Sequence, residues 1–384
     1  GKTISVEVSS NVEYTMSAPD WLDTSVAEEK GETKVYSVTA APNDTGSDRS
    51  GSIVFENREA EVSATLKVSQ EAIYVEDPEC ISILAIGNSF SIDAVQYLYD
   101  LLLQCGYREV HLGNLYIGGC TLETHSGNLT GKLGAYIYYT NDNGTWSSTD
   151  ATSAQTALSS RKWNYISMQQ ASGSSGVKST YEPYLGNIIT EVRKLAPQAH
   201  LMWHMTWAYQ QNSTHSEFSK YDKDQMKMYN MILDAVREKV LAHQEIEFVI
   251  PCGTAVQNLR TSLIGDNVTR DGYHMAYDTG RYVTAMMWAR QISGRDISGV
   301  TWKPSGYSFS EKQILAIKEA VNNAYDHPYE VTRSQYESEA EVCPPHEELA
   351  AVLKAAGYDP DNYEELQIRL TPNSLYQSPA SSTV

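Results

Sequence analysis

The chain has 384 residues, more than one average domain, so we expect two or three domains. Acidic residues outnumber basic ones by 48 to 29 and give a formal charge of −19. This charge disfavours nucleic acids and anionic membrane surfaces as partners, because like charges repel. No apolar run reaches the roughly 18 residues of a membrane-spanning helix. The five cysteines lack a CxxC spacing, which argues against a zinc ribbon or a redox motif.

Residues 1–73 predict a small β-sandwich. Short stretches of alternating polar and apolar residues follow one another, turn-forming residues separate them, and no helical periodicity competes. This segment resembles the BACON module, an Ig-like domain frequent at the amino ends of secreted glycan-active proteins, in Trp21-Leu22, Asn43, Arg49–Ile53 and Leu66–Gln70. The resemblance implies a sugar-binding module or a spacer. We favour the spacer, because Trp21 is more easily explained as a core residue than as a sugar platform.

Residues 74–79 form a charged segment with a proline, which we interpret as a linker. A different pattern follows over residues 80–328, where strand-like runs alternate with amphipathic helical stretches. The strand candidates are Ile81–Ile86, Glu109–Leu115, Tyr165–Gln170, His200–Thr206 and Ile246–Ile250. Five strands with helices between them predict a three-layer α/β/α domain with a parallel sheet.

Three further segments complete the predicted organisation. Alternating aromatic residues around an Asn-Gly pair predict a hairpin insertion over Tyr136–Trp146. Ser310-Glu-Lys-Gln313 is a capping box and opens the last helix of the domain. Residues 329–384 are acidic, then proline-containing, then rich in Ser, Thr and Pro, which predicts a partly helical extension with a flexible end.

The first candidate catalytic residue is Ser89. The strand 81–86 stops at Gly87-Asn88-Ser89, and a helical pattern begins straight after it. A serine on a sharp turn between a buried strand and a helix exposes its hydroxyl at the carboxyl edge of the sheet, where open α/β folds place their chemistry. The competing interpretation is a helix N-cap, because Asn88 and Ser89 are both good capping residues.

The second candidate is the pair Asp271 and His274, which are three residues apart with Gly272 between them. A turn there can bring the carboxylate to the imidazole Nδ1–H, which leaves Nε2 to accept a proton from a serine hydroxyl. With Ser89 the pair makes a Ser-His-Asp set in the chain order Ser, Asp, His. The competing interpretation is a surface turn without a catalytic role.

The two segments together resemble the SGNH (GDSL-like) hydrolase superfamily, and more closely a gut-bacterial branch that often follows BACON-type modules. Gly87–Ser89 matches its first block, and Asp271–His274 matches its last block. Asn114–Thr121 is similar to the second block. The resemblance therefore implies that the backbone N–H of Gly119, or alternatively of Gly118, belongs to the oxyanion hole together with that of Ser89.

One block departs from the family pattern. The family has Gly-x-Asn-Asp after the third strand, whereas this chain has Met168-Gln-Gln-Ala171. Glutamine carries the same amide donor on a longer side chain, so Gln170 is the expected oxyanion donor and Gln169 the alternative.

The remaining candidates surround this site. His204, Trp207 and Tyr209 lie near the carboxyl end of the fourth predicted strand and are expected to line a substrate pocket, together with Asn88, Gln169 and Tyr273. His200 and His204 have an i, i+4 spacing, but they lie in a strand-like run, so a wall of the core or pocket is favoured over a metal pair. Cys120 is interpreted as a buried filler rather than a nucleophile.

The sequence thus predicts an exported protein, secreted, periplasmic or at the cell surface, whose export signal lies outside this sequence. The expected activity is ester hydrolysis without metal or cofactor, and family association points to an O-acylated carbohydrate as substrate. The competing hypothesis is a glycan-binding or surface protein that retains the SGNH fold without catalysis. The oligomeric state is left open.

Overall fold

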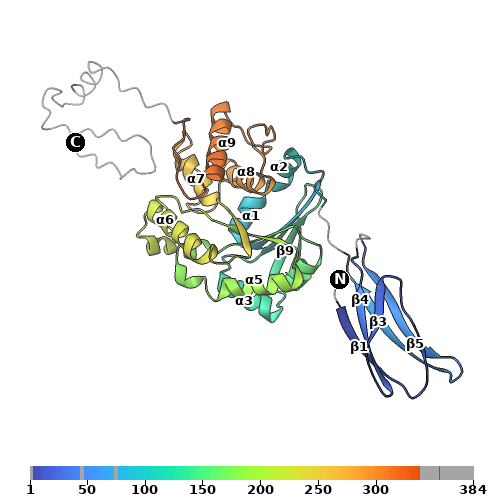
Figure 1. Cartoon of the computed structure of the whole chain (residues 1–384). Helices are drawn as coiled ribbons and strands as arrows, with labels where there is room; N and C mark the ends of the chain where they lie inside the picture. Colours follow the sequence, from blue (N-terminus) through green and yellow to red (C-terminus); the bar gives the residue numbers. More distant parts are fainter. Residues whose placement is uncertain (1–2, 44–46, 73–76, 338–353, 355–384) are drawn as a thin grey trace. The chain divides into compact units, whose positions relative to one another are not determined.

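The computed structural model describes residues 3–43, 47–72 and 77–337, together with Lys354. Its contacts divide it into two compact units, one formed by Gly1–Asp77 and the other by Pro78–Val384 (Figure 1). The division falls within the segment 74–79 that the sequence marks as a linker. The predicted flexible end lies outside the described residues.

The first unit consists of two three-stranded antiparallel sheets. Their strand orders are β1 (Thr3–Ser9)-β4 (Thr33–Ala40)-β3 (Leu22–Lys30) and β2 (Thr15–Ser17)-β5 (Arg49–Asn57)-β6 (Val62–Gln70). Apolar and polar residues alternate along these strands because only one face of each sheet contributes to the core. The buried residues of this core are Leu22, Tyr36, Val38, Ile53 and Phe55. The predicted β-sandwich is confirmed.

Trp21 belongs to this core rather than to an open surface. It packs against the buried cluster and is partly buried, and the guanidinium of Arg49 lies over its ring at 4.6 Å from the centroid. A Cβ at Gly51 would lie 3.5 Å from the same ring. With these neighbours in place, Trp21 does not present a bare aromatic face.

The second unit is built on a seven-stranded sheet. Its order is β10 (Ser147–Thr152)-β9 (Tyr136–Asn141)-β8 (Glu109–Tyr116)-β7 (Cys80–Gly87)-β11 (Tyr165–Met168)-β12 (His200–His204)-β13 (Ile246–Ile250). Five neighbouring strands of this sheet are parallel, in the order β8-β7-β11-β12-β13. Numbered along the chain, this order is 2-1-3-4-5, that of a doubly wound fold. The predicted hairpin exists as β9 and β10, and it extends the sheet because β9 pairs antiparallel with β8.

Helices cover both faces of the sheet (Figure 1). One layer contains α1 (Ser89–Val95), α2 (Leu98–Gln104), α7 (Cys252–Arg260), α8 (Thr279–Ser293) and α9 (Glu311–Asp326). The other layer contains α3 (Leu122–Gly131), α4 (Ala154–Ser159), α5 (Tyr184–Leu195) and α6 (Gln225–Ala235). The predicted capping box at Ser310 is present at the start of α9. This arrangement confirms the predicted three-layer α/β/α domain.

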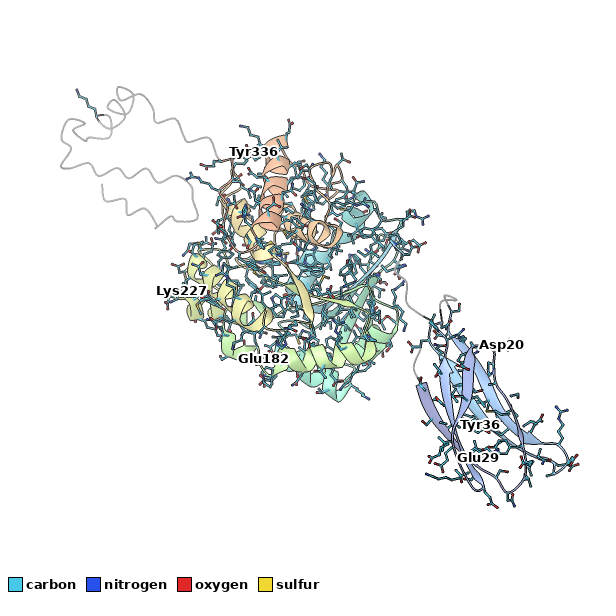
Figure 2. All side chains as sticks on the ribbon, viewed as in Figure 1. Asp20, Glu29, Tyr36, Glu182, Lys227 and Tyr336 are labelled. Carbon is cyan, nitrogen blue, oxygen red and sulfur yellow. The ribbon has the colours of Figure 1, made fainter. Side chains whose placement is uncertain are left out.

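The first part of the predicted extension packs on this unit. Tyr336, labelled in Figure 2, contacts the hydrophobic core. Its carbonyl accepts a hydrogen bond from Leu263 N at 2.7 Å. Thr332 N donates to the side chain of Asn258 at 2.7 Å. The α/β unit therefore continues to at least residue 336, beyond the boundary expected at residue 328. Among the described residues, no helix combines the length and apolarity that crossing a membrane requires.

Candidate active site

Ser89 is the first residue of α1, directly behind the carboxyl end of β7. The N-cap is Asn88, whose Oδ1 accepts a hydrogen bond from Phe90 N at 3.0 Å. The capping requirement is therefore met by Asn88, and the Ser89 hydroxyl is directed elsewhere. The turn is tight: a Cβ at Gly87 would lie 2.6 Å from Ser91 Oγ and 2.9 Å from Gln169 Oε1, so the close approach requires glycine.

Asp271 and His274 lie on one turn and meet Ser89. His274 Nδ1 is 2.7 Å from Asp271 Oδ2, and His274 Nε2 is 2.8 Å from Ser89 Oγ. Because the carboxylate accepts, Nδ1 carries the proton and Nε2 presents its lone pair to the serine hydroxyl. The side chain of His274 is 17% exposed and that of Asp271 39%. The three residues thus form a continuous hydrogen-bonded chain that solvent can reach.

The carboxylate of Asp271 is held in its charged form. Burial alone would raise its pKa, but hydrogen bonds from the His274 side chain and from the backbone N–H groups of His274 and Tyr273 outweigh this effect and lower the pKa below 3.8. The two backbone bonds are 2.8 and 3.2 Å long and both end on Oδ1. Oδ2 is therefore left for the imidazole, so one carboxylate both shapes the turn and orients the ring.

The segment that follows β12 is hydrogen-bonded to the Asp271–His274 turn. Trp207 Nε1 donates to Tyr273 O at 2.7 Å, and Gln210 N donates to Gly272 O at 2.8 Å. The ring of Trp207 also stacks on Phe90 of α1, with centroids 4.4 Å apart. Trp207 thereby touches both the helix that begins with Ser89 and the turn that carries His274.

Gly119 lies on a neighbouring turn after β8. Its φ is +62°, a left-handed conformation that favours glycine, and no atom lies within 4 Å of a Cβ built there. Asn88 Nδ2 donates to Cys120 O at 3.1 Å, which ties this turn to the residue before Ser89. The space beside Gly119 is therefore open, and its backbone is fixed next to the Ser89 turn.

The two glutamines after β11 have different environments, although each is 1% exposed. Gln170 Nε2 donates to Thr180 O and Thr180 Oγ1, both at 3.0 Å. Its Oε1 accepts from Leu122 N at 3.0 Å and from Ala171 N at 2.8 Å. Both amide hydrogens are thus used on Thr180, so Gln170 has no donor left for an oxyanion, contrary to the expectation from the sequence.

Gln169 instead joins the Ser89 turn. Its Nε2 donates to Asn88 Oδ1 at 2.9 Å, and its Oε1 is 2.9 Å from His204 Nδ1. The assignment follows from the network, because Asn88 Oδ1 already accepts from Phe90 N and so requires a donor from Gln169. Burial lowers the pKa of His204 to about 3, so this imidazole is neutral and donates through Nδ1.

Most of the expected pocket residues lie beneath the site rather than along an open pocket. Trp207 and Tyr209 are fully buried, and Asn88, Gln169 and His204 are at most 2% exposed. Trp207 is buried where the segment after β12 packs against the Asp271–His274 turn, and Gln169 is buried between its hydrogen-bond partners Asn88 and His204. Tyr273 is the one member of the expected set that is partly exposed. His200, at the other end of β12, pairs with Glu247 at 2.6 Å, so the two histidines are not a metal pair.

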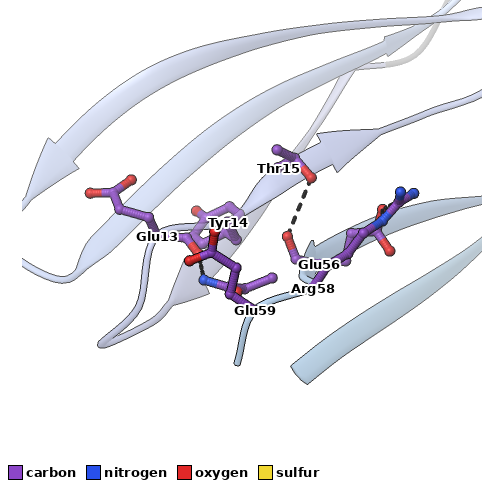
Figure 3. A pocket seen from close by; sticks show the side chains of 7 residues that line it. Glu13, Tyr14, Thr15, Glu56, Arg58 and Glu59 are labelled. Atoms are coloured by element: carbon purple, nitrogen blue, oxygen red, sulfur yellow. Dashed lines mark hydrogen bonds and ion pairs between the residues drawn. The ribbon is translucent and has the colours of Figure 1, made fainter. Parts of the chain in front are cut away.

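Two other places in the described residues gather polar side chains, a cluster at one end of β7 and β8 and a hollow on the β-sandwich. Cys80, Glu109 and His111 have potential metal-ligand atoms within 4.8 Å of one another, but they lie at the amino ends of β7 and β8, at the edge opposite Ser89. An open hollow on the β-sandwich is lined by Glu13, Tyr14, Thr15, Glu56, Asn57, Arg58 and Glu59 (Figure 3). Arg58 is paired with Glu56 at 3.0 Å, and this lining contains no histidine or cysteine.

Comparison with known families identifies both units. Residues 82–326 match the family described as Domain of unknown function (DUF4886), and residues 10–71 match BACON, described as an N-terminal binding domain. The first match spans more than half of the chain, so the chain belongs to the DUF4886 family. No curated protein sequence is significantly similar to it.

Three solved structures are similar to this chain to different extents. A DUF4886 family protein from Bacteroides uniformis ATCC 8492 is 38% identical, with a TM-score of 0.64, and the match covers 67% of this chain and 100% of that chain. A protein of Slackia heliotrinireducens assigned to the SGNH hydrolases is 20% identical, with a TM-score of 0.34, over 56% of this chain and 99% of that one. A carbohydrate esterase family 3 structure from Talaromyces cellulolyticus is 9% identical, with a TM-score of 0.37, over 55% and 96%.

The last two similarities are too low to carry an argument about activity. The strand order and the family matches confirm a doubly wound α/β domain of the DUF4886 family behind a BACON module.

Proposed function

We propose that this member of the DUF4886 family is a serine ester hydrolase, with Ser89 as nucleophile, His274 as general base and Asp271 as the residue that orients the imidazole. The observation that carries the proposal is the hydrogen-bonded chain from Asp271 Oδ2 through His274 to Ser89 Oγ, with distances of 2.7 and 2.8 Å. Both contacts have the length expected between a nucleophile, its base and the orienting acid.

The proposed reaction proceeds in two steps. Ser89 Oγ attacks the ester carbonyl carbon while its proton passes to His274 Nε2, and a tetrahedral oxyanion forms. The bond to the alcohol oxygen then breaks, and the alcohol leaves with the proton from His274. In the second step His274 takes a proton from water, the hydroxide attacks the acyl-enzyme, and the acid is released as the proton returns to Ser89. Asp271 stabilises the imidazolium in both steps.

The proposed oxyanion hole consists of the backbone N–H groups of Ser89 and Gly119 and the side-chain amide of Gln169. Support for Gly119 comes from its left-handed conformation, the open space beside it and its tie to Asn88. Support for Gln169 comes from its position: one amide hydrogen is used on Asn88, and an amide nitrogen carries a second. Gln169 thus takes the role that the sequence comparison gave to Gln170.

The proposed substrate is an O-acetylated or otherwise O-acylated carbohydrate outside the cytoplasm. This part rests on the BACON module and on the resemblance to SGNH esterases, because one fold serves many esters. The negative charge of the chain, −19, also favours neutral substrates over polyanions. The competing function, glycan binding without catalysis, is tested by the same experiment.

The test is release of acetate from acetylated glycans and of p-nitrophenol from p-nitrophenyl acetate. Ser89→Ala removes the proposed nucleophile, whereas Ser91→Ala is a matched control, because Ser91 is buried two residues further along α1 and its hydroxyl donates to Asn88 O at 2.7 Å. We expect Ser89→Ala to abolish release and Ser91→Ala to retain it. Equal rates for the wild type and Ser89→Ala would overturn Ser89 as the nucleophile, and rates that both equal the uncatalysed background would favour the non-catalytic alternative.

A further inference from the structure

A buried carboxylate connects the two halves of the proposed site. Asp93 lies on α1 four residues after Ser89, so both side chains lie on the same face of the helix. Asp93 is 0% exposed, and its Oδ2 accepts a hydrogen bond from Met275 N at 2.9 Å. Met275 follows His274 directly, so this bond joins the helix that begins with Ser89 to the turn that carries the base.

Two arginines from the same region complete the contacts of Asp93. Arg270 Nη1 is 3.0 Å from Oδ1 and 3.1 Å from Oδ2, and Arg281 Nε is 2.8 Å from Oδ1. Arg270 directly precedes Asp271, and its guanidinium also donates to Met275 O. Asp93 therefore contacts the chain immediately before Asp271 and immediately after His274, which fixes both ends of the turn.

The turn itself is narrow. Thr269 and Met275 form an antiparallel bridge, and Arg270 N donates to His274 O at 2.9 Å. A rotation of this turn relative to α1 would carry His274 Nε2 away from Ser89 Oγ. Within the described residues, the turn is hydrogen-bonded to α1 through Arg270 and Met275, which both contact Asp93, and through His274, which contacts Ser89. Trp207 and Gln210, from the segment after β12, also donate to this turn, at Tyr273 O and Gly272 O.

Stability alone does not explain a charge at this position. Removing a carboxylate from water is costly, and replacing a buried ion pair by apolar side chains is often neutral or stabilising. A carboxylate does, however, offer about four acceptor sites, enough for a backbone N–H and two arginines at once. We propose that Asp93 is a positioning residue, which holds the Asp271–His274 turn at the start of α1 so that His274 stays within reach of Ser89.

This inference rests on the proposed esterase function, and the two can fail separately. Loss of activity in Ser89→Ala tests the function, whereas Asp93→Asn tests the positioning. Asp93→Asn keeps the size of the side chain but removes the charge that draws in both arginines. A misplacement of about 1 Å costs about 10²-fold in rate, so we expect kcat to fall by about 10² while KM stays close to the wild-type value.

The control separates positioning from stability. Asn164→Ala removes a buried acceptor from Ser82 N and Ser82 Oγ, both at 2.8 Å, at the opposite end of β7. It destabilises the same domain without touching the turn. Activity is expressed per reactive serine, counted with an organophosphate ester, so that unfolded chains do not enter kcat. We expect Asn164→Ala to lower the unfolding midpoint and keep the wild-type kcat per site.

Asp93→Asn with the wild-type kcat per reactive serine would overturn the inference while leaving the triad intact. If Asp93→Asn does not fold, Arg270→Gln takes its place, because Arg281 still neutralises Asp93 in that variant. We expect Arg270→Gln to lower kcat with little change in KM, and an unchanged kcat in this variant would equally overturn the inference.

Discussion

The two neighbouring glutamines offer a sharp test of the proposed oxyanion hole. Gln169→Ala and Gln170→Ala remove the same side chain from adjacent residues, each 1% exposed. In the proposed site only Gln169 donates to the oxyanion, because both amide hydrogens of Gln170 are used on Thr180. We therefore expect the two variants to differ in kcat, although both should be less stable than the wild type.

The expected magnitudes follow from these contacts. Loss of one oxyanion donor typically costs about 10²–10³ in kcat, or about 2.7–4 kcal/mol, which we expect for Gln169→Ala. Gln170→Ala leaves Leu122 N and Ala171 N without their acceptor. A buried group left unpaired costs about 1–3 kcal/mol of stability, so this variant should unfold more readily and keep its kcat.

The assay combines kcat per reactive serine with urea-induced unfolding of the same preparations. Gln169→Ala also leaves His204 Nδ1 and Asn88 Oδ1 short of a partner, so both variants are expected to lose stability. The two variants should therefore lose stability to a similar extent, and only their kcat values should distinguish them. A Gln170→Ala variant that loses as much kcat as Gln169→Ala would refute the assignment, as would a Gln169→Ala variant with the wild-type kcat.

Four further predictions concern the activity of Asp271→Asn, its stability in acid, the stability of Gly119→Ala and the pH dependence that His204 contributes. Asp271→Asn should lower kcat by about 10⁴, because an amide no longer fixes the tautomer of His274; a loss of less than tenfold would contradict its role. The folded-state pKa of Asp271 is lowered, so its stabilising contribution is present above the unfolded pKa and is lost as pH falls through the folded value; urea unfolding of wild type and Asp271→Asn should converge in acid. Gly119→Ala should lower stability by about 1–2 kcal/mol through its positive φ, measured by urea unfolding, since the space for a methyl group is open. Burial lowers the pKa of both His204 and His125 to about 3; protonation in the unfolded chain should therefore make stability fall below about pH 6.5, with each histidine contributing at most about 1.4 kcal/mol per pH unit, and His204→Asn should remove its own share of that slope.

The fold and the triad candidates could be predicted because each depends on short-range sequence. The apolar run that becomes β7 ends at Gly87, and the acid and the imidazole on the second segment are three residues apart, so local geometry alone predicts a turn that brings Asp271 to His274. Their meeting with Ser89 follows from parallel strands, which place their carboxyl ends at one edge of the sheet. The structure brings these three side chains together, and their catalytic role remains a proposal.

The choice between Gln169 and Gln170 could not be made from the sequence. Adjacent residues within a strand point to opposite faces of the sheet, but β11 ends at Met168, two residues before the predicted end, so both glutamines lie outside the strand. The strand alternation of side chains therefore does not extend to Gln169 and Gln170, and it cannot assign either of them to a face of the sheet. Only the partners, Thr180 for one and Asn88 for the other, distinguish them.

Burial of long side chains was equally hard to foresee. Trp207 and Tyr209 follow β12 at the edge where substrates bind in such folds, yet both are fully buried because this segment packs under the Asp271–His274 turn. Asp93 was not identified from the sequence, although the composition of α1 indicates it. It is the single charged residue in α1, a helix whose other residues include buried Phe90 and Val95, and a lone acid on such a helix indicates a buried partner.

The most direct measurement of the central claim is the covalent intermediate itself. The wild-type protein is mixed rapidly with p-nitrophenyl acetate, quenched in acid during the first turnover, digested and examined by mass spectrometry. The proposed mechanism predicts a burst of one p-nitrophenol per active chain and one acetyl group on the peptide that contains Ser89, absent from Ser89→Ala. Absence of a burst together with an unmodified Ser89 peptide, while acetate is still released, would contradict it.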